Sequence, residues 1–468
     1  MKRTAAPACR PTVTRRTLLS AAACLPFAAC ASTPDVSAYL KDGRLRRAIL
    51  GSHRPLTAHE RGALLSELAP GLRTDALQRQ LAFQRALSDS PLVAGNRVQL
   101  LRDGVQAFPA MFAALERARN HINLEFFILE DVVCKGTRLS DLLLDRLRHG
   151  VRVNIIYDAW GSRGTPGELF DALRRAGASV VAFNPVNPLV SRVGWSPNDR
   201  DHRKIMVVDG KIGFTGGINL DRVYENRRAA GLGDGDAMHA YWRDTAVRIE
   251  GPAVAELQKV FFGTWRSQKA PPMRPAAYYP LLPPRGDETV RIMGSSPGDN
   301  RPLYYISLMT AVAGAIERAW LSTGYFVPPH AEREQFYAAA RAGIDLRLVL
   351  PSHSDVDATV YAARAAYGDL LGAGAKIYEM QAVVLHSKVA TVDGVWSVVG
   401  SSNLDRRSVV FNNEVDAIIL GRDTAAQVES LLRQDMAQSR QITLAAWQRR
   451  SLGERLHELE ARVWQYWM

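Results

Sequence analysis

Cysteine is scarce in this sequence of 468 residues, which has four copies. Three of them lie within the first thirty residues, so the remainder of the chain has a single cysteine, Cys134, and cannot hold an internal disulfide framework. The cysteines and histidines also lack the close spacing of a zinc site. The sequence therefore excludes a disulfide-stapled scaffold, and we expect neither a metal nor another cofactor.

Long apolar runs are absent as well. No stretch of roughly 18 consecutive apolar residues occurs, so no transmembrane helix is expected in the mature protein. A short apolar run, Leu18 to Ala29, follows a basic stretch that contains Arg15-Arg16, as in twin-arginine export signals. Phe27-Ala28-Ala29-Cys30 resembles a lipoprotein signal. We interpret residues 1–29 as a signal peptide and Cys30 as a lipidation site, with a plain secretory signal as the alternative.

Acidic residues are outnumbered, with 47 Asp and Glu against 59 Lys and Arg, which gives a formal charge of +12. Loss of residues 1–29 would remove five positive charges and no acid, and would leave +7. This balance favours an anionic partner, either nucleic acid or an acidic membrane surface. With a lipid on Cys30, we expect an exported protein at the periplasmic face of an anionic phospholipid membrane, with the inner and the outer membrane both open.

The chain is too long for one core, so two domains are expected. From Val98 onward the sequence alternates between strand and helix patterns. A β-branched and aromatic stretch at 122–128, a helical pattern at 139–148 and a second strand pattern at 151–157 predict a βαβ unit. The predicted fold is therefore α/β, with a parallel or mixed sheet.

The second half of the chain repeats the order of the first. Ala114 to Ala118 returns as Ala315 to Ala319, and a proline-rich segment lies between the halves. The segment is either a solvated linker or a lipid-facing surface formed by Tyr278, Tyr279, Leu281 and Leu282. The predicted organisation is a helical N-terminal extension at 30–92, a first domain at 93–270, a linker at 271–285 and a second domain at 286–468.

Each half carries the same polar residues at the same spacing. A histidine is followed by a lysine two positions later, an aspartate at seven, a glycine at fourteen and an asparagine at seventeen. A single histidine–lysine–aspartate set arises by chance at roughly one position in ten thousand, so one copy would be weak evidence. Two copies in register are strong evidence; their members are His202, Lys204, Asp209, Gly216 and Asn219, and His386, Lys388, Asp393, Gly400 and Asn403.

This spacing is what a β-hairpin requires. A histidine and a lysine two residues apart in a strand point to the same face. Asp209-Gly210 after four apolar residues predicts a two-residue hairpin loop, which would put Gly217 opposite His202. The second copy would likewise put Ser401 opposite His386. Each hairpin would thus gather a histidine, a lysine, a small residue and an asparagine, with the motif aspartates in the turns as structural residues.

A third strand in each half contributes an acid. Asp244 stands seven residues before Gly251, and Glu414 stands seven residues before Gly421. We expect each acid to support the histidine of its own half and to fix its tautomer. The alternative is that both are exposed or salt-bridged carboxylates.

The duplicated residues indicate phosphoryl transfer. Two buried structural histidines would explain the histidines alone, but not the duplicated lysines and asparagines. Lysine ammonium groups and asparagine amides stabilise the negative charge of a phosphoryl transition state. Two facing histidines let one attack phosphorus while the other protonates the leaving oxygen.

These motifs resemble the HKD motifs of the phospholipase D superfamily, over about residues 93 to 468. Within it the chain most resembles bacterial cardiolipin synthases, through Gly95-Asn96-Arg97-Val98, Asp201-His202-Arg203-Lys204, Trp242-Arg243-Asp244, Arg248-Ile249-Glu250-Gly251-Pro252, Gly324-Tyr325-Phe326-Val327-Pro328 and Leu385-His386-Ser387-Lys388. The resemblance implies a pseudo-symmetric pair of α-β-α sandwich domains with one active site between them. It also places Asp209 and Asp393 in the catalytic set, against the structural interpretation above. The chain departs from many family members, which have membrane-spanning helices, in its lipoprotein-like signal.

The resemblance further implies the reaction. His202 would attack the phosphodiester of phosphatidylglycerol while His386 protonates the departing glycerol, and a second phosphatidylglycerol would then accept the phosphatidyl group. The lysines, Asn219, Asn403 and Ser401 would hold the phosphate oxygens. The opposite assignment of the histidines stays open, as does the oligomeric state.

Three other functions compete. A hydrolytic phospholipase D would use the same residues with water as acceptor. An exported phosphodiesterase or nuclease would fit the basic charge, but stacking motifs for nucleic acid are not apparent and a lipid anchor fits it poorly. A non-catalytic tethered binding protein is disfavoured because neither copy has lost its histidine or lysine.

Overall fold

The computed structural model describes residues 49–50, 90–185, 196, 198–225, 241–299 and 303–450. The predicted signal peptide and Cys30 lie outside these residues. Of the extension predicted to be helical, the structure describes little more than β1 (Ile49–Leu50), a short strand that pairs in parallel with the start of β2 (Leu92–Arg102). Within the described ranges, no helix is both long and apolar enough to cross a bilayer.

The first half of the chain forms a mixed sheet in which one interior strand, β3, lies between a parallel and an antiparallel neighbour. The β3–β6 and β6–β7 pairings are parallel, as the predicted βαβ unit requires, and the remaining pairings are antiparallel. In spatial order the strands are β7 (Ser179–Phe183), β6 (Arg152–Asp158), β3 (His121–Phe126), β9 (Lys204–Val208), β10 (Ile212–Gly216), β12 (Thr245–Glu250) and β2.

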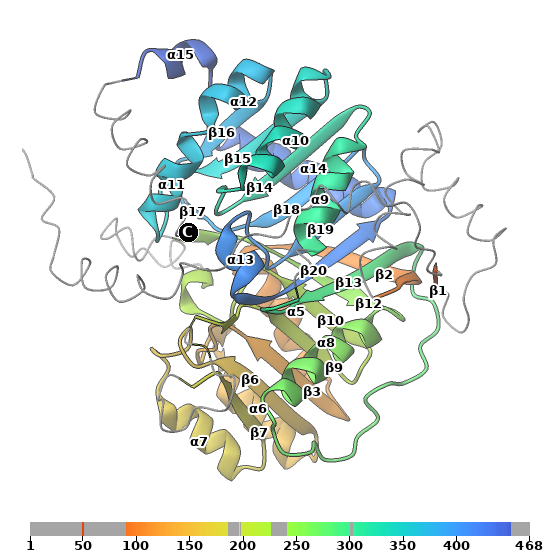
Figure 1. The fold of residues 1–468 in the computed structure, drawn as a ribbon. Helices are drawn as coiled ribbons and strands as arrows, with labels where there is room; N and C mark the ends of the chain where they lie inside the picture. Colours follow the sequence, from red (N-terminus) through yellow and green to blue (C-terminus); the bar gives the residue numbers. More distant parts are fainter. Residues whose placement is uncertain are drawn as a thin grey trace, which may run out of the picture.

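The second half repeats this order. Its strands are β16 (Lys376–Met380), β15 (Asp345–Pro351), β14 (Arg318–Thr323), β18 (Lys388–Val392), β19 (Trp396–Gly400), β20 (Asn412–Leu420) and β13 (Glu288–Ser295), with β21 (Ser439–Ile442) added outside β16. The strands β2 and β13 pair with each other and join the halves into one continuous sheet. Figure 1 shows the two halves stacked across this junction.

Helices cover both faces of the sheet, which confirms the predicted α-β-α sandwich. One face of the first half packs against α5 (Asp103–Glu116), α6 (Leu139–Arg148) and α7 (Gly167–Arg175), and the corresponding face of the second half against α9 (Leu303–Ala313), α10 (His330–Arg341) and α12 (Tyr367–Ala373). The other face packs against α8 (Val254–Ser267) and α14 (Arg422–Ala437). The hydrophobic core beneath these two helices contains residues from both halves. The shorter helices are α11 (Asp357–Arg364), α13 (Arg406–Val410) and α15 (Leu444–Gln448).

Strand β9 shows why the motif strands are apolar throughout. Successive side chains of a strand point to opposite faces, and both faces of this sheet are covered by helices. Met206 and Val208 accordingly belong to the core beneath α5–α7, whereas Ile205 and Val207 belong to the core beneath α8 and α14. The strand is therefore a rigid support for the histidine and lysine at its start.

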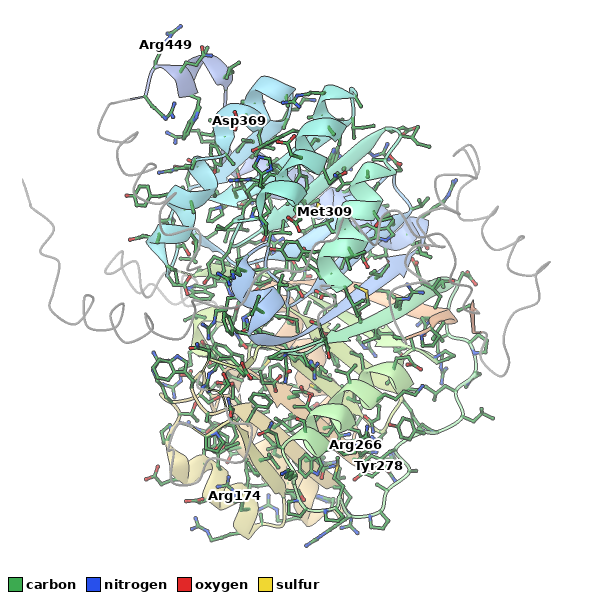
Figure 2. All side chains as sticks on the ribbon, viewed as in Figure 1. Arg174, Arg266, Tyr278, Met309, Asp369 and Arg449 are labelled. Atoms are coloured by element: carbon green, nitrogen blue, oxygen red, sulfur yellow. The ribbon has the colours of Figure 1, made fainter. Side chains whose placement is uncertain are left out.

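The predicted linker, 271–285, is irregular and lies against the first half. The ring of Tyr278 packs 4.7 Å from His121 and 5.0 Å from Phe262, and Figure 2 shows it near Arg266 at the end of α8. Leu282 is buried, while Tyr279 and Leu281 are exposed. Because Tyr278 and Leu282 contact protein, the predicted lipid-facing surface reduces to Tyr279 and Leu281.

Candidate active site

Two short parallel pairings bring the motif histidines together at the seam between the halves. Strand β8 (Arg200–Asp201) pairs with the first residues of β20, and β17 (Val384–Leu385) pairs with β11 (Trp242–Arg243). Each pairing continues into the following histidine: the main-chain N–H of His202 donates to the carbonyl of Asn413, and that of His386 to the carbonyl of Arg243, both at 2.9 Å. Each histidine is thus held by the main chain of the other half.

The two imidazole rings face each other across the seam. Their centroids are 6.4 Å apart and their planes are inclined by 77°. His202 is 8% exposed and His386 is 5% exposed, so both are largely shielded from solvent. Each ring engages an acid through Nδ1, and neither Nε2 makes a hydrogen bond with a residue that the structure describes, so both can face a substrate.

Each acid contacts the histidine of the other half, contrary to the prediction. Nδ1 of His202 lies 3.0 Å from Oε2 of Glu414, and Nδ1 of His386 lies 2.7 Å from Oδ2 of Asp244. Each acid was expected to support the histidine of its own half. That expectation is wrong because the parallel pairings at the seam set each histidine beside the acid-bearing strand of the other half.

The space around the carboxylate of Asp244 fits a short acidic side chain. The hydroxyl of Tyr224 donates to Oδ2 of Asp244 at 3.1 Å, and the N–H of Thr245 donates to Oδ1 at 2.7 Å. Gly217 stands so close that a Cβ there would lie 2.1 Å from Oδ1 of Asp244. Tyr224 was not identified from the sequence, since it lies outside the repeated motif.

The longer acid, Glu414, has a different set of donors. The hydroxyl of Ser401 donates to its Oε2 at 2.5 Å, and Nδ2 of Asn412 donates to its Oε1 at 3.1 Å. Ser401 therefore braces the acid rather than reaching toward a phosphate, contrary to its predicted role.

The hairpin turns are as predicted but the register is not. Asp209 and Gly210 both have left-handed backbones, with φ of 54° and 62°, and the N–H of Lys211 closes the turn on Val208. Strand pairing then resumes at Val208–Ile212, one residue later than a two-residue loop allows, and the second hairpin shows the same shift. As a result Gly217 and Ser401 lie beside the acids, not opposite the histidines.

The motif aspartates are structural in their contacts, as the turn geometry predicted. The carboxylate of Asp209 accepts the main-chain N–H groups of Arg119, Asn120 and His121. The carboxylate of Asp393 accepts those of Ile316, Glu317 and Arg318. Both lie at the far ends of β9 and β18 from the histidines, so the structure does not bring them into the site that the resemblance assigned to them.

Each motif lysine contacts the main chain of the histidine two residues before it. Nζ of Lys204 donates to the carbonyl of His202 at 2.7 Å, and Nζ of Lys388 donates to the carbonyl of His386. Burial lowers the pKa of Lys204 to about 7 and that of Lys388 to about 8. A bound phosphate would favour the ammonium forms, because an opposite charge nearby stabilises the charged state.

The two asparagines are buried beside the motif strands. Oδ1 of Asn219 accepts the N–H of Ile128 at 3.2 Å, which leaves its Nδ2 to donate to a phosphate oxygen. Oδ1 of Asn403 is buried without a hydrogen-bond partner among the described residues. A buried acceptor without a partner costs free energy, so a substrate hydroxyl that donates to this oxygen would relieve that cost, whereas phosphate oxygens could bind only to the amide Nδ2.

The histidines differ in their electrostatics. Burial and the two lysines lower the pKa of His202 well below its usual 6.5. Burial and Lys388 also lower the pKa of His386, but Asp244 opposes the shift. Burial raises the pKa of Glu414 to about 7, whereas Lys388 and the hydrogen bond from His386 outweigh burial and hold the pKa of Asp244 below 3.8. The neutral form is therefore favoured at both histidines, and more strongly at His202, because Asp244 opposes the shift at His386.

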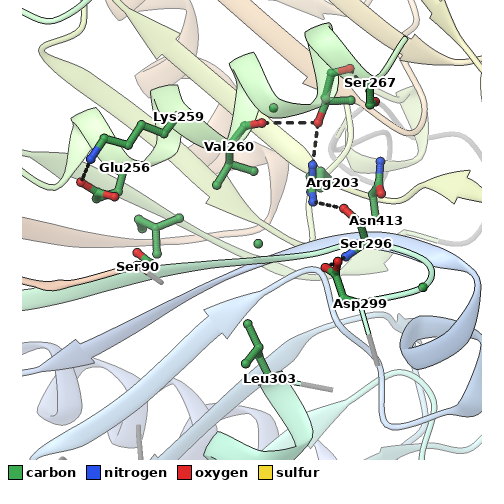
Figure 3. Close-up of a pocket in the computed structure, with 15 residues that line it drawn as sticks. Ser90, Arg203, Glu256, Lys259, Val260, Ser267, Ser296, Asp299, Leu303 and Asn413 are labelled. Atoms are coloured by element: carbon green, nitrogen blue, oxygen red, sulfur yellow. Dashed lines mark hydrogen bonds and ion pairs between the residues drawn. The ribbon is translucent and has the colours of Figure 1, made fainter. Parts of the chain in front are cut away.

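A separate cavity of ≈ 810 Å³ lies between the halves behind the motif (Figure 3). Arg203 points into it from between His202 and Lys204, and its guanidinium is held by Thr264, Ser296 and main-chain carbonyls. Neither His202 nor His386 lines the cavity, so it is distinct from the site that the two histidines form. In the part of the chain described, no group of His, Cys, Asp and Glu is arranged to hold a metal ion.

The chain is similar to proteins that are already known. A family model described as "Cardiolipin synthase, PLD-like domain" matches residues 111–228 and 308–436, and each segment contains one H-x-K motif. Cardiolipin synthase A of Pseudomonas aeruginosa (strain LESB58) is 37% identical over 383 residues, which cover 81% of this chain and 74% of the relative. Cardiolipin synthase A of Pseudomonas syringae pv. syringae (strain B728a) is 34% identical over 406 residues, with coverages of 85% and 80%.

A solved structure shares the fold. The phosphatidylserine synthase of Haemophilus influenzae Rd KW20 superposes with a TM-score of 0.62 at 12% identity, over 83% of this chain and 98% of that one. At that identity the likeness shows the α-β-α architecture of paired domains and no more.

Proposed function

The chain belongs to the phospholipase D-like family of cardiolipin synthases and is a phosphatidyltransferase of that type, and from this premise we propose that it joins two phosphatidylglycerol molecules through a phosphatidyl-histidine intermediate. The observation that carries the proposal is the pair of facing histidines, 6.4 Å apart at their ring centroids, each held at Nδ1 by an acid from the other half. Such a pair supplies one nucleophile and one proton carrier to the same phosphorus.

In the first step, Nε2 of His202 attacks the phosphorus of phosphatidylglycerol. The P–N bond forms, the P–O bond to the head group breaks, and protonated His386 gives its proton to the departing glycerol oxygen. Lys204, Lys388 and the two asparagines stabilise the negative charge that spreads over the phosphate oxygens. The products of this step are free glycerol and phosphatidyl-His202.

In the second step, the head-group hydroxyl of another phosphatidylglycerol attacks the same phosphorus. The new P–O bond forms, the P–N bond breaks, and the hydroxyl proton goes to His386. Cardiolipin leaves and both histidines return to their starting protonation states. The overall reaction converts two phosphatidylglycerols into one cardiolipin and one glycerol.

The assignment of His202 as nucleophile is supported by its electrostatics. An attacking imidazole must be neutral, and the pKa of His202 is lowered more strongly than that of His386, where Asp244 opposes the effects of burial and Lys388. Purified His202→Ala and His386→Ala enzymes, incubated with acyl-labelled phosphatidylglycerol and quenched in denaturant, test it. We expect a covalent phosphatidyl adduct only in His386→Ala, and an adduct in His202→Ala would reverse the assignment.

Product analysis tests the whole proposal. Purified protein is incubated with phosphatidylglycerol vesicles, and the lipids and released glycerol are quantified. Cardiolipin and glycerol in equal amounts are expected. Phosphatidic acid without cardiolipin would instead identify a hydrolytic phospholipase D, and degradation of DNA without lipid turnover would overturn the lipid assignment.

For localisation, we propose that the protein is exported and held at the periplasmic face of a membrane by a lipid on Cys30. The twin-arginine stretch, the Phe27-Ala28-Ala29-Cys30 sequence and the basic charge support this proposal. Cells expressing the wild type and Cys30→Ser, grown with labelled palmitate, provide the test. We expect label and membrane association in the wild type, and loss of the label in Cys30→Ser; equal labelling of both would refute it.

A further inference from the structure

A buried arginine contacts the acid of each histidine–acid pair. Arg203 is 4% exposed and Arg243 is 1% exposed. Arg203 directly follows His202 in the chain, whereas Arg243 directly precedes Asp244. Both arginines belong to the first half, so the second half supplies a histidine and an acid to the site but neither of these guanidinium groups.

The two arginines come from positions that are not equivalent. Strand β8 pairs with β20 in the same way as β17 pairs with β11, so the residues before the two acids correspond, and so do the residues after the two histidines. Arg243 therefore corresponds to Asn413, and Arg203 corresponds to Ser387. Where one half carries an arginine, the other half carries a shorter polar side chain.

Despite this difference, both guanidinium groups make the same contact. Nε of Arg203 donates to the main-chain carbonyl of Glu414 at 3.0 Å, and Nη1 of Arg243 donates to the main-chain carbonyl of Asp244. These carbonyls belong to the acids whose side chains engage the motif histidines. Two different positions thus supply one guanidinium to each acid, which the filling of space alone would not require.

Arg203 is fixed by hydrogen bonds to two other elements. Its Nη1 donates to the hydroxyl of Thr264 on α8 at 2.6 Å. Its Nη2 donates to the carbonyl of Ser295, the last residue of β13, at 2.7 Å, and to the hydroxyl of Ser296 at 3.1 Å (Figure 3). The guanidinium therefore ties the main chain of Glu414 to a helix of the first half and to a strand of the second.

Arg243 is fixed by two carboxylates. Its Nε and Nη2 donate to the two oxygens of Asp435 on α14, at 2.9 and 2.8 Å, and its Nη1 lies 3.3 Å from Oδ1 of Asp103. The same oxygen of Asp103 accepts the main-chain N–H of Asp244 at 2.9 Å. Because a bidentate arginine–carboxylate pair fixes orientation as well as distance, the main chain of Asp244 is held rigidly against α14.

We infer that Arg203 and Arg243 are positioning residues, each of which fixes one acid so that its carboxylate meets Nδ1 of the histidine from the other half. Each arginine acts through its acid, because it holds the main chain from which the carboxylate extends. A shift of about 1 Å at a catalytic group can lower a rate by about 100-fold. The inference rests on the proposed transfer through histidine, since only then does the placement of the acids affect the rate.

Arg203→Lys tests the inference with little disturbance of charge. Lysine keeps a cation near Glu125, whose Oε1 lies 3.7 Å from Nη1 of Arg203, but it lacks the fork that bonds to α8, β13 and Glu414 together. We expect kcat for cardiolipin formation to fall by about tenfold or more, because the acid is no longer held against its histidine. KM for phosphatidylglycerol should change by less than about threefold, because the lost contact acts on the histidine and not on the lipid.

Arg364→Lys is the matched control. Arg364 forms a bidentate pair with Glu379, at 2.8 and 3.1 Å, and Glu379 is not an acid of the site. The substitution breaks the same kind of fork, so it should lower stability in the same way and keep kcat.

A cycle of double variants separates positioning from general stability. Arg203→Lys added to Glu414→Gln should cost little more than Glu414→Gln alone, since residues that act as a unit are not additive. Added to Asp244→Asn, Arg203→Lys should lower kcat by as much as it does in the wild type. Arg243→Lys should show the reverse pattern, with the two acids exchanged.

Urea unfolding shows which variants are folded under the assay conditions, and either arginine variant that folds tests the same relationship. An arginine that serves only the fold would lower the unfolding midpoint and leave kcat of the folded enzyme within about threefold of the wild type. That result, or an equal fall of kcat in both acid backgrounds, would overturn the positioning role. Wild-type enzyme that makes no cardiolipin would instead refute the proposed function.

Discussion

Oδ2 of Asp244 lies 2.7 Å from Nδ1 of His386, although the two residues belong to different halves of the chain. The reciprocal contact, between Glu414 and His202, crosses in the opposite direction. Neither half therefore contains a complete histidine–acid pair. Both histidine–acid pairs are assembled only when the sheet closes at β2–β13 and the parallel pairings form at the seam.

The contact between Asp244 and His386 can be tested with the Asp244→Asn variant. An amide in place of this acid no longer favours the His386 tautomer with its proton on Nδ1, and it no longer stabilises the imidazolium, so kcat should fall by about 100-fold or more. The double variant Asp244→Asn/His386→Ala should be little worse than His386→Ala alone, because residues that act as a unit are not additive. Kinetics of cardiolipin formation provide the measurement. Full additivity with His386→Ala, but not with His202→Ala, would contradict the crossing.

Gly217→Ala should weaken the contact between Asp244 and His386, because it displaces the acid. The new Cβ would lie 2.1 Å from Oδ1 of Asp244, so the acid must move away from His386. We expect a loss of kcat of about tenfold to 1000-fold, because a displacement of about 1 Å at a catalytic group has effects of this size. Gly164→Ala is the matched control, since a Cβ at Gly164 meets nothing within 4 Å. Equal kcat values for the two variants would show that Asp244 tolerates the displacement.

The sequence predicted the architecture well because duplication is visible in it. The repeated H-x-K sets, the βαβ pattern and the two-domain division all follow from spacing and hydrophobic periodicity, which depend on local geometry. The histidines and lysines that lie together at the seam, His202, Lys204, His386 and Lys388, were identified for the same reason. Local spacing also identified Asp209 as a turn residue, and its contacts confirm that role.

The errors in the sequence-based predictions have a common physical origin in long-range contacts. The partner of each acid depends on how the two halves dock, because the paired residues are 212 and 142 positions apart, and spacing within one half carries no information on that. A one-residue shift in each hairpin moved Gly217 and Ser401 from the histidines to the acids. Tyr224 was missed as a site residue because the second half has no aromatic residue at the equivalent position.

The pH dependence of the reaction should follow the buried lysines. Lysine is cationic below its pKa and neutral above it, and the values of about 7 for Lys204 and about 8 for Lys388 describe the substrate-free protein. As pH rises through this range the free enzyme loses the positive charge that binds phosphate, so kcat/KM for phosphatidylglycerol should fall from about pH 7 upward. Bound phosphate raises both lysine pKa values, so the alkaline fall of kcat should occur at a higher pH.

Profiles of kcat/KM and kcat between pH 5 and 10, with vesicles of constant composition, test this expectation. Lys388→Arg provides the matched variant, because a guanidinium stays charged throughout the range and should move the alkaline fall upward even if the rate at neutral pH drops. Coincident alkaline limbs for kcat and kcat/KM, unchanged in Lys388→Arg, would show that the lysines do not set the profile.

Asp209→Ala separates a structural from a catalytic role for the motif aspartates. The carboxylate of Asp209 accepts three main-chain N–H groups ahead of β3, and removal of it leaves these donors without their partner. We expect a loss of about 1–3 kcal/mol in the free energy of unfolding, with kcat of the folded enzyme within a few-fold of the wild type. Urea unfolding and cardiolipin assays on the same preparation, at a temperature where the variant is folded, measure the two quantities.

Asp393→Ala should behave alike, because its carboxylate accepts the equivalent N–H groups ahead of β14. A variant of wild-type stability with kcat reduced by more than about 100-fold would place these aspartates in the catalytic machinery after all, since a lost catalytic group, unlike a lost turn contact, acts on the rate and not on the fold.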